Sequence, residues 1–154
     1  MTEMERVQNY KSGEKPLGLG WMYIVDKDEE GLSRLLQIVK LISSHPSDKW
    51  PNYDEWQELL PKWFLDSFRQ YSQDEALELM RKTPREKWTE IPWDFGSWLD
   101  AVRVRGWSWW SSASEEELMK IFLSISNWPA SLQAFEHIIT SSGLIISLSE
   151  EITG

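Results

Sequence analysis

The stretch LGLGWMYIV, residues 17–25, decides the class of fold, because it is the clearest strand pattern in a chain dominated by helical patterns. Its β-branched and aromatic side chains are typical of strands, although Gly18 and Gly20 weaken the pattern. Residues 144–148, near the other end of the chain, have a similar apolar composition. Pairing of these two segments would tie both ends of the chain together around a helical body.

Between the two strands, apolar residues recur at three- and four-residue spacing, which predicts amphipathic helices. Pro61, Pro84 and Gly106 mark places where a helix breaks or ends. We expect helices over 30–43, over 53–71 with a kink or break at Pro61, over 72–82, from 94 to 105, and over 128–142.

Residues 107–126 admit two interpretations. Residues 107–114 are expected to form an aromatic, Ser-rich connection, after which Ser114 and Glu117 have the spacing of a helix capping box. This cap favours a helix through Ile125. Residues 121–126 are also apolar enough for a buried strand, and periodicity does not distinguish the two.

The fold class that follows is α+β, with a mainly helical single domain of five or six helices and a small sheet of two or three short strands. A chain of 154 residues has the usual size of one domain. Residues 1–16 contain several helix breakers and are expected to be a flexible lead-in. Residues 17–154 are expected to be the globular domain.

Eleven of the 154 residues are tryptophan, which is the most unusual feature of the composition. Each indole can bury about 150–250 Å² and needs a partner for its N–H when buried. One small interior cannot easily hold eleven such groups, so we expect several to lie half-buried at the ends of elements or on the surface. Exposed tryptophan matters because this residue type is enriched at binding hot spots.

The segment from Arg103 to Trp110 is the strongest candidate for a binding site. In an extended conformation, the two-residue period would place both of its arginines and two of its tryptophans on one face. Such a face is typical of a protein-interface hot spot, of a platform for single-stranded nucleic acid, or of a sugar-binding shelf. The structural alternative is that the arginines end a helix and the tryptophans cover the core. We predict five partner-binding residues: Arg103, Arg105, Trp107, Trp109 and Trp110.

The charge balance favours a basic protein partner. The chain has 25 acidic and 16 basic residues, which gives a net charge of −9. Duplex nucleic acid and anionic membranes are disfavoured as partners, because both attract basic surfaces. The lack of cysteine, of a secretory signal and of a long apolar run predicts a cytoplasmic protein. The oligomeric state does not follow from the sequence.

No pattern typical of a cofactor or metal site stands out. The acidic run that begins at Asp26 resembles the start of a calcium loop, but Gln37 stands where a bidentate Glu is required. The two histidines, His45 and His137, are far apart in the sequence, and no cysteine could complete a metal site with them. We therefore expect no cofactor and no metal.

The function predicted from these features is that of a small acidic protein-interaction domain without catalytic activity. An inhibitor or immunity-type protein that masks a basic site on its partner has this charge and aromatic content. The alternative is a small enzyme or small-molecule-binding protein that combines an aromatic-lined pocket with carboxylate acid/base groups.

Overall fold

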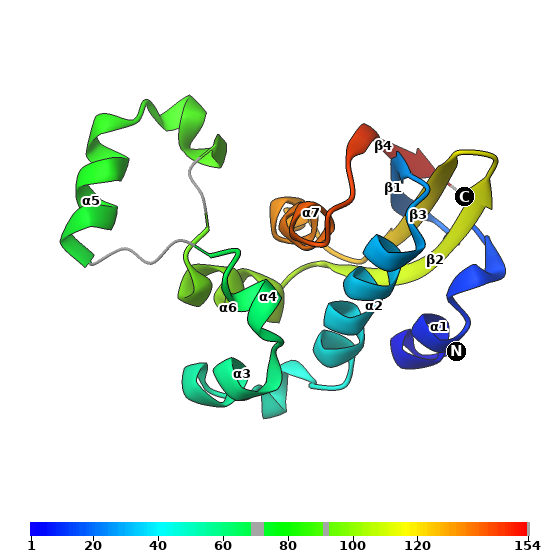
Figure 1. Ribbon diagram of the computed structural model, residues 1–154, viewed down its shortest axis with the longest axis horizontal. Helices are drawn as coiled ribbons and strands as arrows, with labels where there is room; N and C mark the ends of the chain where they lie inside the picture. The colour runs from blue at the N-terminus through cyan, green and yellow to red at the C-terminus, as the bar shows by residue number, and fades with distance from the viewer. Residues whose placement is uncertain (69–72, 91–92, 154) are drawn as a thin grey trace.

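The computed structural model describes residues 1–68, 73–90 and 93–153. Its sheet has four antiparallel strands in the order β2-β3-β1-β4 (Figure 1). The strands are β1 (Leu19–Asp26), β2 (Trp107–Glu115), β3 (Leu118–Ile125) and β4 (Ile146–Thr153).

Seven α-helices lie in the described ranges: α1 (Glu3–Gln8), α2 (Glu29–Ser43), α3 (Tyr53–Leu59), α4 (Lys62–Leu65), α5 (Gln73–Lys82), α6 (Phe95–Arg103) and α7 (Leu132–Ser141). Short 3-10 turns follow α1 (Tyr10–Ser12), precede α3 (Ser47–Lys49) and follow α5 (Arg85–Glu90). Side chains of Asp28, Asn52 and Asp94 cap α2, α3 and α6 by accepting backbone N–H bonds. Ser72, at which the helix over 72–82 is expected to begin, lies outside the described residues. Within this part of the chain, no helix is both long and apolar enough to cross a membrane.

The α+β class is confirmed, but the predicted numbers of elements are wrong: seven helices and four strands are present in the described ranges, against five or six and two or three. The main error lies in residues 107–125, which form the β2–β3 hairpin. Ser114 and Glu117 have the spacing of a helix cap by coincidence, because the chain turns between them, with Glu116 at φ 20°. The helix predicted there is thus replaced by β3.

The two strands at the ends of the chain pair with each other, from Leu19 opposite Thr153 to Val25 opposite Ile146. The strand expected over 144–148 begins later and runs further, so that Glu150 and Glu151 belong to β4 and not to a tail. Gly20, which weakened the strand pattern, is needed for packing, since a Cβ there would lie 2.8 Å from the Leu123 carbonyl oxygen.

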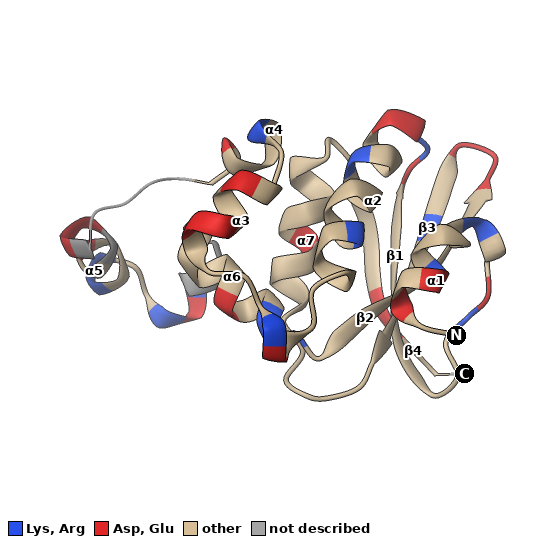
Figure 2. Cartoon of the chain, turned by 90° about the horizontal axis from the view of Figure 1, so that it is seen from below, with Lys and Arg blue, Asp and Glu red and all other residues tan. Residues whose placement is uncertain are grey.

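The core lies between one face of the sheet and the helices. Helices α2 and α7 lie against this inner face (Figure 2), and α6 packs on α7. Tyr23 and Val25 of β1 and Ile121 and Leu123 of β3 point into it and are fully buried. The remaining buried side chains come mainly from α2, α6 and α7.

The N-terminal segment, expected to be a flexible lead-in, contains α1, whose capping box is formed by Thr2 and Glu5. It runs along the outer edge of β2. The carboxylate of Glu3 accepts the backbone N–H of Trp109 at 2.8 Å. Further along β2, Ser112 Oγ donates to the Tyr10 carbonyl at 2.8 Å. One edge of the sheet is therefore covered by the beginning of the chain.

Candidate functional site

The structure places the two tryptophans at the centre of the predicted surface in the interior. Trp107 is 2% exposed and Trp109 0% exposed. The indole Nε1 of Trp107 donates to the Ser131 carbonyl at 2.9 Å, and its ring meets Phe135 edge-on at 4.9 Å between centroids. This corrects the expectation that both rings lie on an exposed face, because β2 turns them toward the helices.

The other residues of that segment join the N-terminal helix to the sheet. Arg105 forms an ion pair with Glu3, in which the two side chains are 17% and 16% exposed. The guanidinium of Arg6 lies over the half-buried ring of Trp110, 3.3 Å from its centroid. Arg103 alone among the five is exposed, and its Nε donates to the Ser47 carbonyl at 3.1 Å. These contacts are internal to the chain.

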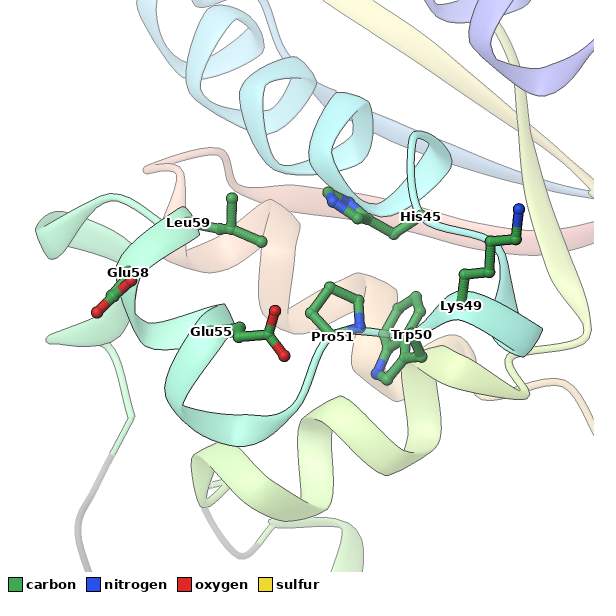
Figure 3. A pocket seen from close by; sticks show the side chains of 7 residues that line it. All are labelled: His45, Lys49, Trp50, Pro51, Glu55, Glu58 and Leu59. Carbon is green, nitrogen blue, oxygen red and sulfur yellow. The ribbon is translucent and has the colours of Figure 1, made fainter.

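A hollow of about 760 Å³ opens beside α3 (Figure 3). Its seven lining residues are His45, Lys49, Trp50, Pro51, Glu55, Glu58 and Leu59. Glu55 is engaged in the capping box of α3, where it accepts the Asn52 N–H at 3.1 Å. Its carboxylate points toward Pro51, whereas that of Glu58 points away from His45. The hollow therefore shows no carboxylate held next to the imidazole for proton transfer.

Two pairs of titratable or hydroxyl groups lie beside α7 instead. Tyr23 Oη donates to Glu136 Oε2 at 2.9 Å. Burial raises the pKa of the Tyr23 phenol, and the neighbouring Glu136 carboxylate raises it further. Burial also raises the pKa of Glu136, although the bond from Tyr23 opposes that shift. The carboxyl group with a raised pKa thus lies outside the hollow beside α3, so the two features of the enzyme alternative do not coincide.

Ser67 and His137 form the second pair, with 3.0 Å between Oγ and Nε2. Burial lowers the pKa of His137 to about 4, so the imidazole is neutral at pH 7. The Ser67 hydroxyl donates to the Phe64 carbonyl, which leaves its oxygen to accept an N–H from His137. In this arrangement His137 cannot act as a base toward Ser67. The described residues also contain no group of three acidic or histidine side chains placed to hold a metal ion.

The open edge of the sheet carries a different cluster. β4 pairs on one side with β1 alone, and most of its side chains are exposed. Trp21 of β1 lies directly opposite Glu151, and its Nε1 donates to Ser149 Oγ at 2.7 Å. Trp128, which is 48% exposed, meets Trp21 edge-on at 6.1 Å. We call Trp21, Trp128, Glu150 and Glu151 the edge cluster.

The edge cluster is acidic as well as aromatic. Glu150 and Glu151 are exposed, and neither forms an ion pair with another residue in the described ranges. Because side chains of a strand alternate between faces, Glu151 lies on the inner face with Trp21, whereas Glu150 lies on the outer face opposite Met22. Both faces of the open edge therefore carry a carboxylate.

Sequence reasoning missed the edge cluster because its members come from three distant segments. The sequence assigns Trp21 to a strand interior, Trp128 to the start of a helix and both glutamates to a tail. Apolar residues at positions 146, 148 and 152 alternate in part with polar residues, which is the pattern of a strand. Extending that strand pattern across the glutamates would have placed them in the sheet.

Comparisons with protein-family models, with curated proteins and with solved structures found no match to this chain.

Proposed function

We propose that this chain is an acidic protein-interaction domain that binds a basic surface on a partner protein. The net charge of −9 supports this proposal, because it steers basic partners toward the molecule. An inhibitor or immunity-type protein that occludes a basic site would work in this way. We do not place the contact with the partner at residues 103–110, because Trp107 and Trp109 of that segment are buried.

The edge cluster is the observation that carries the proposal. An exposed indole beside unpaired carboxylates offers a Lys or Arg side chain both an ionic partner and an aromatic face. Trp128 supplies an indole that is 48% exposed, and Glu151 lies opposite Trp21, whose ring Trp128 contacts. The aliphatic stem of a long basic side chain can pack on the same rings.

The test compares partner capture by three forms of the full chain: the natural sequence, Glu150→Lys/Glu151→Lys, and Asp54→Lys/Glu58→Lys. The control pair makes the same change of charge on exposed residues of α3, far from β4 (Figure 1). A captured protein is identified by mass spectrometry, purified and titrated against each form. We expect the edge variant to bind at least about tenfold more weakly and the α3 variant to bind normally.

Two results would contradict this function. One is a purified partner without a basic surface, and the other is a partner that binds the natural chain and the edge variant equally. A loss confined to the α3 variant would move the site to the hollow beside that helix. Circular dichroism of each variant checks that the fold is retained before the affinities are compared.

A further inference from the structure

The two edges of the sheet differ in whether another segment of the chain covers them. The N-terminal segment hydrogen-bonds along β2, through Glu3, Tyr10 and Glu14. β4 has no such cover among the described residues: it is eight residues long, pairs only with β1 and is largely exposed. A bare edge of this length presents a row of unpaired backbone N–H and C=O groups, which is the template used in strand addition.

We propose that β4 accepts a basic, extended segment of the partner as a fifth strand of the sheet. This inference rests on the proposed function and specifies its mode of binding. Backbone hydrogen bonds along β4 supply affinity for any strand, and the side chains that flank the edge select which strand binds.

The carboxylates select basic side chains on both faces of the added strand. A strand that pairs with β4 lies about 4.8 Å away, so its side chains stand beside those of β4 on the same face. Residues next to Glu150 and Glu151 lie on opposite faces, as those two glutamates do. The structure therefore favours a segment with two successive Lys or Arg residues. The basic residue on the inner face, beside Glu151, also extends toward Trp21 and Trp128.

Apolar side chains select the rest of the segment. Leu148 lies in β4 opposite Ile24 and is 41% exposed, and Ile145 just before the strand is also exposed. An apolar residue of the added strand beside Leu148 would cover it. The preferred segment thus combines adjacent basic residues with an apolar residue two or three positions away.

A second copy of this chain fits the edge poorly. Antiparallel pairing of two β4 strands would bring the glutamates of one copy close to those of the other. Like charges at neighbouring positions of two paired strands repel each other and destabilise the pair. The charge of Glu150 and Glu151 thus favours a basic partner over self-association, and sedimentation velocity of the full chain tests for the latter.

The binding test uses capped eight-residue peptides made of valine, threonine, lysine and arginine, titrated by fluorescence anisotropy. Two versions carry N-methyl groups on alternate residues, in complementary positions. A strand added to one edge uses the N–H groups on one side only. We expect one methylated version to bind at least about tenfold more weakly and the other to bind within about threefold of the unmodified peptide.

The protein variants complete the test. Glu150→Lys/Glu151→Lys should weaken binding of the unmodified peptide at least about tenfold, and Asp54→Lys/Glu58→Lys should leave it unchanged. Equal binding of both methylated peptides would overturn strand addition while leaving the acidic interaction function intact. Absence of binding by the unmodified peptide, or self-association of the chain through β4, would also overturn this inference. The proposed function fails separately, through the partner-capture experiment.

Discussion

At the residue scale, burial of an indole raises the question of which acceptor its Nε1–H finds as well as where its ring packs. Trp98 and Trp107 donate to the carbonyls of Ala134 and Ser131, in α7 and just before it, at 3.0 and 2.9 Å. Trp56 and Trp109 are also buried, but their Nε1–H groups have no partner in the described part of the chain. Most of the other tryptophans are only half-buried, and for this reason one small core can accommodate so many.

This difference between two neighbouring tryptophans of β2 is testable. Trp107→Phe removes ring volume and a hydrogen bond, whereas Trp109→Phe removes ring volume alone. We expect Trp107→Phe to lower the free energy of unfolding by about 1 kcal/mol more than Trp109→Phe. Urea denaturation followed by circular dichroism measures both. An equal loss in the two variants would show that the bond to Ser131 contributes nothing.

The buried imidazole of His137 predicts a pH dependence of stability. Its pKa is lowered to about 4 in the folded protein, against about 6.5 in the unfolded chain. The unfolded state therefore binds more protons between these values, and this contribution to stability is present above pH 6.5 and lost as pH falls toward 4.

An NMR titration of the His137 ring protons should give a midpoint near 4. Glu136, with its raised pKa, contributes in the opposite sense, because its stabilising effect is lost as pH rises. Comparison with His137→Phe isolates the histidine contribution. A titration midpoint at 6 or above would mean that His137 is not buried as described.

At the scale of elements, local signals predicted helices α2 and α6 but missed α1 and the β2–β3 hairpin. The break at Pro61 is read correctly from the sequence, because it depends on residues within one turn. The β2–β3 hairpin was missed because Ser111 and Ser112 gave β2 the composition of a loop. Both hydroxyls bond to the N-terminal segment, a contact that no local pattern reveals.

The contacts between α1 and β2 predict how much stability is lost when Glu3 is replaced. Glu3→Ala removes the partner of Arg105 and leaves the Trp109 N–H without its acceptor. We expect a loss of about 2–3 kcal/mol in the free energy of unfolding, since the pair is mostly buried. Glu115→Ala, which breaks a more exposed pair with Lys120, should cost less than about 1 kcal/mol. Equal costs would contradict a structural role for α1.

At the scale of the whole molecule, pairing of the first and last strands brings together residues that no sequence window contains. Trp21, Trp128 and Glu151 meet because β1 pairs on one side with β4 and on the other with β3, which ends shortly before Trp128. In the strongest sequence candidate, Arg103–Trp110, the strand β2 turns Trp107 and Trp109 into the core, where Trp107 contacts α7 and the residue before it. Composition predicted an acidic molecule, and only the topology shows where its carboxylates lie unpaired.

The charge of the open edge predicts a salt dependence of binding. Glu150 and Glu151 are exposed, so their attraction for basic side chains is screened by ions. We expect the dissociation constant of the basic peptide to rise about tenfold between 0.05 and 0.5 M NaCl. Titrations at several salt concentrations measure this slope. A dissociation constant that does not change with salt would show that contact with the carboxylates is not part of binding.

Amide hydrogen exchange of the full chain, with and without the basic peptide, tests most directly whether β4 is the docking edge. Strand addition predicts slower exchange for the alternate amides of residues 146–153 that point away from β1, with the amides of α1, β2 and α3 unchanged. Slower exchange around the hollow beside α3, with β4 unaffected, would contradict the account.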